Sequence, residues 1–184
     1  MDGKTKTNPP RDVGGCVMEQ SQELWEWIYE IQKKLKPLDE PHRTIHLLET
    51  LKSTKSSGLD DLQVWWLIVD TWVESKTNSS TKYIWEEVFS LRKVPSWYTD
   101  HLPENMNVYR GGDPSGVSWT LCNEKGQWFA ERYRKNQKFW GMTISKKDVL
   151  FYTNLREEEE VVIVPKDYHQ IREIGYCPRY DKVA

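Results

Sequence analysis

The sequence has few cysteines, no long apolar run and almost no net charge. Its three cysteines, Cys16, Cys122 and Cys177, are odd in number and lack a CxxC spacing, which argues against a disulfide scaffold or a zinc site and favours a reducing compartment. No stretch approaches the roughly 20 apolar residues of a membrane helix, and the polar residues 1–15 lack the apolar core of a signal peptide. We therefore expect a soluble, cytoplasmic protein that does not use a membrane.

Charge is balanced along the chain. The formal net charge is −2, from 26 basic and 28 acidic side chains, which excludes a polycation that binds nucleic acid non-specifically. The exception is one local run in which every charged side chain is basic: Arg132, Arg134, Lys135, Lys138, Lys146 and Lys147. This run is either a solvated face or a surface that attracts a phosphate-bearing ligand or an acidic partner.

Aromatic residues, in contrast, are abundant. The chain holds 10 Trp, 9 Tyr and 4 Phe, and each buried ring removes roughly 150 Å² or more from water, so a substantial core is expected. Residues 1–17 lack an apolar period and are predicted to form a flexible tail. Residues 18–95 show helical periods, which predict helices near 24–35 and 41–53, from after Ser57 to Val73, and near 81–92.

Residues 96–184 change to short runs of β-branched and aromatic residues bounded by Gly, Pro, Asn and Asp. These runs predict strands near residues 106–110, 116–120, 139–144, 149–152, 160–164 and 170–174. One helix interrupts them, with Asn123 as its cap and Arg134 as its end, and its apolar side is expected to be Trp128, Phe129 and Tyr133. Helices ahead of a mostly antiparallel sheet predict an α+β fold.

Two segments of this half combine glycine or hydroxyl side chains with residues that bind ligands. In Tyr109-Arg110-Gly111-Gly112, a guanidinium at the end of a strand stands beside glycines that let a phosphate or carboxylate approach closely. In Ser118-Trp119-Thr120, the period of two places both hydroxyls on one face of the strand and Trp119 on the other. Each segment alone is also typical of an ordinary turn or strand.

A third segment is a run of four glutamates, residues 157–160, that leads directly into the apolar strand 161–165. Glu158 and Glu160 are two apart, so a strand holds their carboxylates on the same face. A rigid carboxylate pair accepts hydrogen bonds from ribose hydroxyls and stabilises positive charge on a sugar ring. Near an arginine and a hydroxyl, this pair indicates a site for a sugar and an anion.

Taken in chain order, the three segments resemble the Arg-Ser-Glu class of mono-ADP-ribosyltransferases over residues 105–175. The shared pattern is Tyr-Arg-Gly on a first strand, Ser-x-Thr before a helix with Phe-Ala, and Glu-x-Glu leading into an apolar strand that ends in Pro. The resemblance implies an ADP-ribosyltransferase-like core in residues 96–184, NAD as co-substrate and no metal. It implies an enzyme that moves ADP-ribose from NAD to a macromolecule.

The resemblance also implies a role for each matching residue. Arg110 is expected to contact the phosphates or the nicotinamide ribose of NAD, with Ser118 supporting that site. Thr120 is expected to steady the strand, and Trp119 either lies beside the nicotinamide or fills the core. The full set expected to bind NAD is Tyr109, Arg110, Gly111, Ser118, Trp119 and Thr120.

The two acids are expected to carry the chemistry. Glu160 matches the catalytic glutamate of the family, which binds the nicotinamide-ribose hydroxyl and favours loss of nicotinamide. Glu158 matches the upstream acid, which positions or deprotonates the acceptor. Because family members with an acid at this position often modify arginine, the resemblance favours an arginine of a host or cellular protein as acceptor.

Other hypotheses stay open. The acceptor is water in an NAD glycohydrolase, or a nucleic acid reached through the basic run 132–147. A degenerate transferase fold would instead act as a binding module that contacts a partner through its Trp-rich helices. The chain also suits a phage or mobile-element effector in the host cytoplasm. His42 and His46, four apart, are expected to be surface or core histidines rather than metal ligands.

Overall fold

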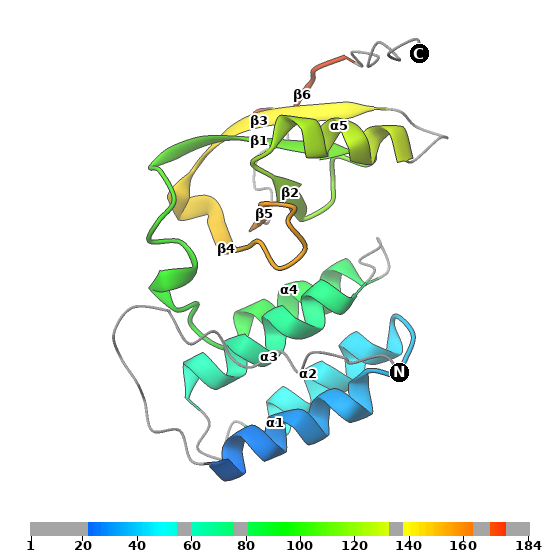
Figure 1. Cartoon of the computed structure of the whole chain (residues 1–184), viewed down its shortest axis with the longest axis vertical. Coiled ribbons are helices and arrows are strands. Elements are labelled where there is room, and N and C mark those ends of the chain that lie inside the picture. Colours follow the sequence, from blue (N-terminus) through cyan, green and yellow to red (C-terminus); the bar gives the residue numbers. More distant parts are fainter. Residues whose placement is uncertain (1–21, 55–59, 76–80, 133–137, 164–169, 176–184) are drawn as a thin grey trace, which may run out of the picture.

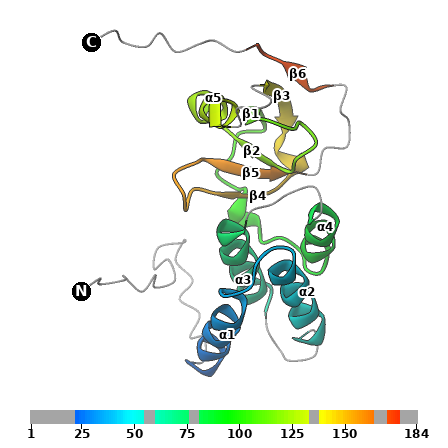
Figure 2. The same cartoon turned by 90° about the vertical axis from the view of Figure 1, so that its right-hand side faces the viewer.

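The computed structural model describes residues 22–54, 60–75, 81–132, 138–163 and 170–175. The first half forms four helices, α1 (Gln22–Leu35), α2 (His42–Thr54), α3 (Asp61–Glu74) and α4 (Lys82–Ser90), followed by the short 3-10 helix η1 (Ser96–Tyr98). These helices form one layer and the sheet forms another (Figures 1 and 2). None of the helices in the described ranges is long and apolar enough to cross a membrane.

The second half forms an antiparallel sheet of six strands in the order β4-β5-β2-β1-β3-β6. Helix α5 (Asn123–Arg132) follows β2 and packs on β1, and the short helix η2 (Lys146–Asp148) joins β3 to β4. The strands are β1 (Asn105–Gly111), β2 (Ser118–Thr120), β3 (Phe139–Ser145), β4 (Val149–Thr153), β5 (Glu160–Ile163) and β6 (Arg172–Glu173).

The predicted α+β fold, with helices ahead of an antiparallel sheet, is confirmed. All six predicted strands overlap observed ones, although β2 begins at Ser118 rather than at 116. Helix α3 begins after Asp60, because Asp60 and Gln63 form a capping box in which each side chain accepts from the other's backbone N–H, at 2.8 and 3.2 Å. Ser57, the tail 1–17 and residue 164 lie outside the described residues.

The predicted apolar side of α5 is wrong. The buried residues of this helix are Gly126 and Ala130, whereas Trp128 is 43% exposed. The reason lies on β1, where a Cβ on Gly111 would stand 2.0 Å from the amide nitrogen of Ala130. Helix and strand therefore touch through their backbones, and a contact this close accepts only small residues. Asn123 is the first residue of the helix, not its cap, and residues 133 and 134 lie outside the described ranges.

An aromatic core joins the helices to the sheet. Trp72 of α3 packs edge to face on Trp85 of α4 and on Phe151 of β4, with ring centroids 4.9 and 6.1 Å apart. Trp65, about two helical turns earlier, also packs against Phe151 at 5.8 Å. A second apolar cluster, which includes Trp119, fills the other side of the sheet. The helical region and the sheet thus share one continuous core rather than meeting at a polar interface.

Arg43, at the start of α2, donates hydrogen bonds to the C-terminal ends of two other helices, α1 and α3. Its guanidinium donates to the carbonyl of Glu74, the last residue of α3, at 2.7 Å. It also donates to carbonyls at and just after the end of α1, those of Leu35, Lys36 and Leu38, at 3.2, 3.3 and 2.7 Å. The last carbonyls of a helix have no partner within the helix, so one side chain here satisfies two helix ends.

We predict that Arg43→Met lowers the free energy of unfolding by about 2 kcal/mol, because several carbonyls lose a charged donor at once. Urea denaturation followed by circular dichroism measures this change. Arg92→Met is the matched control, since Arg92 makes one long contact to Asp61, at 3.5 Å, on the surface. The control should change stability by less than about 0.5 kcal/mol, and an equal loss in both variants would contradict the role of Arg43.

Candidate functional site

The three motifs lie on neighbouring strands, because β2 stands between β1 and β5 (Figure 1). The register pairs Thr120 with both Tyr109 and Glu160. Since alternate residues share a face, Ser118, Thr120 and Glu160 all lie on the face of the sheet that covers α3. Trp119 lies on the opposite face, as the alternation predicts.

Glu160 is a buried carboxylate with donors on both oxygens. Its exposed fraction is 3%. Ser118 Oγ and Trp72 Nε1 donate to Oε1, at 2.5 and 3.0 Å, and Arg156 Nη2 donates to Oε2 at 3.1 Å. A buried charge is tolerated only when it is paired and hydrogen-bonded, and Glu160 meets both conditions. Its position is therefore set by three different segments of the chain.

Arg110 is connected to this carboxylate through Ser118. Its Nη1 donates to the carbonyl of Ser118, and its Nε donates to the carbonyl of Asp113 at 2.6 Å. The guanidinium lies against Gly116, where a Cβ would stand 1.9 Å from Nη2. Ser118 thus binds both residues, the glutamate through its hydroxyl and the arginine through its backbone carbonyl. Because Tyr109 pairs with Thr120, Arg110 lies on the opposite face of the sheet, that of Trp119, so the structure does not bring the guanidinium and the Glu160 carboxylate to one face.

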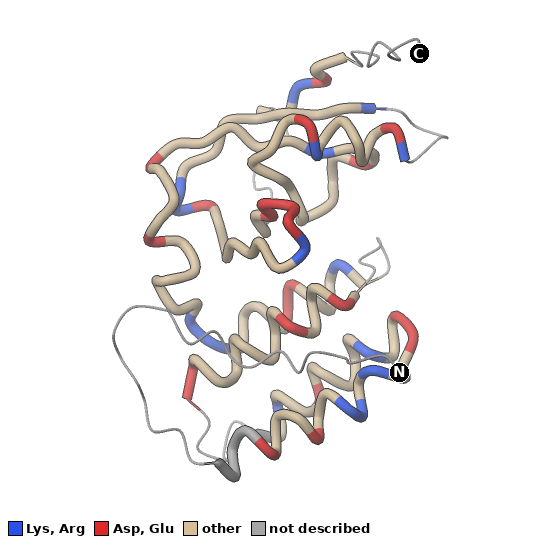
Figure 3. Tube along the Cα trace, viewed as in Figure 1, with Lys and Arg blue, Asp and Glu red and all other residues tan. Residues whose placement is uncertain are grey.

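The loop between β4 and β5 carries Glu158 and a cation that the sequence analysis missed, Arg156. Arg156 Nη2 lies 3.0 Å from Glu158 Oε2 as well as contacting Glu160, and Nη1 donates to the carbonyl of Val73 at 3.2 Å. Figure 3 shows this acidic loop, with a basic residue beside it, between the sheet and the helices. The signal that was available is the spacing, a cation two and four residues before the two acids. The strand expected to hold both acids on one face begins only at Glu160, and Glu158 lies in the preceding loop, so that part of the prediction is wrong.

Two residues of this loop have left-handed backbone conformations, Glu157 with φ 57° and Glu159 with φ 47°. Asn154 holds the turn, since its carbonyl accepts from the amide of Glu157 at 2.9 Å and its side chain accepts from the amide of Glu159 at 3.0 Å. Thr120 Oγ1 adds a bond to the carbonyl of Glu158 at 2.6 Å. Thr120 therefore steadies the acidic loop directly.

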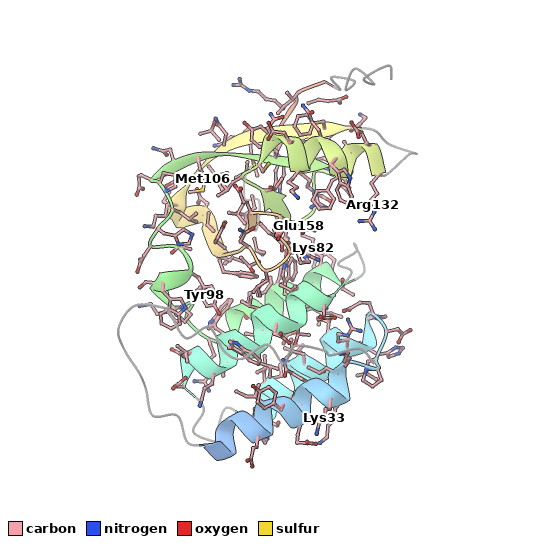
Figure 4. The ribbon with its side chains drawn as sticks, in the orientation of Figure 1. Lys33, Lys82, Tyr98, Met106, Arg132 and Glu158 are labelled. Atoms are coloured by element: carbon pink, nitrogen blue, oxygen red, sulfur yellow. The ribbon has the colours of Figure 1, made fainter. Side chains whose placement is uncertain are left out.

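A cavity of about 390 Å³ opens beside Glu158. Figure 4 shows the Glu158 side chain between the sheet and the helices. One wall is residues 124–129 of α5, and the other is the acidic loop. Trp128 and Phe129, which were predicted to be the apolar side of α5, line this cavity. The full lining is Glu124, Lys125, Trp128, Phe129, Arg156 and Glu158. The cavity thus combines aromatic faces with charges of both signs.

Glu158 and Glu160 lie in different electrostatic surroundings. Burial raises the pKa of Glu158 above its ordinary value; the Arg156 guanidinium opposes this rise, and the Glu160 carboxylate adds to it. Glu158 faces the cavity and its side chain is 21% exposed, whereas the Glu160 side chain is only 4% exposed. Glu158 can therefore exchange a proton with a ligand in the cavity, while Glu160 is held as a fixed acceptor of hydrogen bonds.

The remaining residues expected to bind NAD have structural contacts. Tyr109 stacks on Phe139 with centroids 5.9 Å apart, and Gly111 allows the close approach of α5 described above. Trp119 is 2% exposed and its Nε1 donates to the carbonyl of Gly116 at 2.9 Å. Of the two possibilities for Trp119, the structure thus has it in the core.

The two histidines of α2 have the surface positions expected of them: His42 is exposed and lies 2.9 Å from Asp39, and His46 is half-buried. Cys122 Sγ donates to Glu124 at 3.2 Å. Among the described residues, no group of three or more His, Cys, Asp or Glu side chains is placed to hold a metal ion.

Comparisons with protein-family models, with curated proteins and with solved structures found no match to this chain.

We predict that the effect of Glu158→Gln on stability depends on pH. Because the pKa of Glu158 is raised in the folded state, its contribution to stability is present below the unfolded-state pKa and is lost as pH rises through the folded-state value. Glutamine does not titrate. The stability of the variant minus that of the wild type should therefore increase between about pH 3 and about pH 7 in urea denaturation.

Asp113→Asn is a control of opposite sign. The amide of Ser115, which donates to Asp113 Oδ1 at 2.9 Å, lowers the pKa of that carboxyl. Asp113 therefore stabilises the fold above its unfolded-state pKa and loses this effect in acid. The stability difference for Asp113→Asn should decrease over the same pH range, and parallel trends in both variants would contradict the argument.

Proposed function

We propose that the protein is a mono-ADP-ribosyltransferase that moves ADP-ribose from NAD to a macromolecule. The observation that carries the proposal is the hydrogen bond from Ser118 to Glu160, with Arg110 bound to the carbonyl of the same serine. These are the residues that the sequence motifs single out, and they come from three neighbouring strands. The cavity supplies room for a ligand beside Glu158 and Arg156, although Arg110, Ser118 and Glu160 are not part of its described lining.

The proposed reaction breaks the bond between C1′ of the ribose and the nicotinamide nitrogen. Nicotinamide leaves with the bonding electron pair, and the ribose becomes an oxocarbenium-like cation. Glu160 stabilises this charge and accepts a hydrogen bond from a ribose hydroxyl, while Ser118 keeps the carboxylate in place. The acceptor then bonds to C1′, and its proton passes to Glu158. This chemistry requires NAD as co-substrate and needs no metal ion.

Glu158 and its neighbours favour a guanidinium acceptor. The carboxylate of Glu158 already contacts a guanidinium, that of Arg156, at 3.0 Å, and the cavity continues from this contact past Trp128 and Phe129. Carboxylates pair with guanidinium groups in a fixed geometry, and aromatic faces attract them. An arginine of a cellular or host protein therefore fits this side of the site best. We place the activity in the cytoplasm, as that of a phage or mobile-element effector.

The alternative of an inactive binding module receives less support. That hypothesis uses the tryptophans of the helical region as a contact surface. Trp65, Trp72 and Trp85, however, are 0, 1 and 0% exposed and form the core. These rings are therefore buried between the helices and the sheet, where a partner protein cannot contact them.

The activity is tested by incubating the purified protein with labelled NAD and a cell lysate. We expect nicotinamide release and labelled protein from the wild type, a fall of about a hundredfold or more for Glu160→Gln, and about tenfold for Ser118→Ala. Glu159→Gln, an exposed neighbour with the same change of charge, is the matched control and should keep the wild-type rate.

The products distinguish the acceptors. Label in peptides at arginine supports the proposal in full, label that a nuclease removes supports a nucleic-acid acceptor, and free ADP-ribose alone supports a glycohydrolase. No nicotinamide release, or equal release by the wild type and Glu160→Gln, would refute the enzymatic proposal.

A further inference from the structure

In the described part of the chain, the helical region reaches the candidate catalytic carboxylate through one polar atom, Nε1 of Trp72. Trp72 Nε1, on α3, donates to Glu160 Oε1 at 3.0 Å across 88 positions of the chain. Both side chains are buried, at 1 and 3% exposure. The bond is therefore shielded from water, where a hydrogen bond to a charged group is strongest.

The indole ring of Trp72 has no freedom to turn this N–H elsewhere. It is packed against Trp85, Phe89 and Phe151, with ring centroids 4.9, 5.5 and 6.1 Å away. A phenylalanine at the same position would provide most of this packing and lack the donor. Packing alone thus accounts for an aromatic residue at position 72, whereas it does not account for an indole whose nitrogen meets a carboxylate.

Trp85 provides the comparison within the same core. It is fully buried, stacks beside Phe89 at 5.4 Å and contacts Trp72, yet its Nε1 has no hydrogen-bond acceptor in the described part of the chain. Two neighbouring tryptophans thus share one environment and differ in what their N–H groups do. Only that of Trp72 is directed at the site.

The placement of the donors on Glu160 gives the bond of Trp72 a specific consequence. Oε1 receives Trp72 from the helices and Ser118 from the sheet, while Oε2 receives Arg156 from the loop. Arg156 also binds Glu158 and is partly exposed, so a ligand at Glu158 competes for it. When Arg156 is engaged elsewhere, Trp72 and Ser118 are the two contacts that still orient the carboxylate.

We propose that Trp72 is a positioning residue that orients the ionised Glu160 carboxylate for cleavage of the bond between ribose and nicotinamide. The helical region is then part of the catalytic apparatus, because it supplies a donor that the sheet lacks. This inference rests on the proposed transferase function and assigns the helices a role within it.

The test compares Trp72→Phe with Trp85→Phe, which remove the same atoms from adjacent positions of one core. We expect Trp72→Phe to lower kcat for NAD consumption about ten- to hundredfold, with KM for NAD within about twofold of the wild type. Trp85→Phe should keep kcat within about threefold, because the N–H that it removes has no described acceptor. Urea denaturation of both variants shows whether they lose stability equally.

A second measurement observes the bond without turnover. In protein labelled with ¹⁵N-tryptophan, the indole resonance that is missing from Trp72→Phe should shift strongly in Glu160→Gln, whereas the resonance missing from Trp85→Phe should move little. If Trp72→Phe fails to fold, the Trp72 resonance is assigned instead from its nuclear Overhauser contacts with the rings of Trp85, Phe89 and Phe151, so the inference stays testable.

The outcomes separate the two proposals. If the wild type consumes NAD and Glu160→Gln does not, but Trp72→Phe matches Trp85→Phe in kcat, the positioning role is wrong and the transferase function stands. The inference is also overturned if the chemical shift of the Trp72 indole N–H is the same in Glu160→Gln as in the wild type. If the wild type and Glu160→Gln consume NAD equally, the transferase function itself fails, whatever the tryptophan variants do.

Discussion

The Glu160 carboxylate is buried, and the positions of several elements of the described structure are tied to the hydrogen bonds that it accepts. A charge removed from water needs donors around it, and here they come from a helix, a strand and a loop. Each donor is itself fixed: Trp72 by the aromatic core, Ser118 by the strand whose carbonyl binds Arg110, and Arg156 by Glu158 and the end of α3. Core packing and site geometry are consequently one network.

The same network gives two glutamates, two residues apart, different properties. Glu160 points between the layers and is enclosed, while Glu158 borders a cavity and shares one cation with its neighbour. Different surroundings thus give the two carboxyl groups different properties: donors enclose that of Glu160, whereas burial raises the pKa of Glu158, which faces the cavity. The left-handed turns at Glu157 and Glu159 make this division possible, because they fold the loop back so that Arg156 meets both acids.

The sequence predicted what depends on near neighbours. The alternation of Ser118 and Trp119 set their faces correctly, since a strand's period is local. The sequence could not predict contacts between residues far apart in the chain. Periodicity identifies Trp72 as a core residue, but its neighbours in the sequence do not show that its N–H donates to a carboxylate 88 positions away. The face of α5 was missed for a similar reason, because it depends on Gly111 of another element.

The two glycines at the contact between α5 and β1 control the width of the cavity, although neither of them lines it. Gly111 and Gly126 let the helix rest on the strand, with a Cβ at Gly126 only 2.7 Å from that of Tyr109. The distance between Trp128 and the acidic loop therefore depends on two glycines at the contact between the helix and the strand. A bulkier residue at either glycine would lift the whole wall, and the size of the cavity would change while every residue that lines it stayed the same.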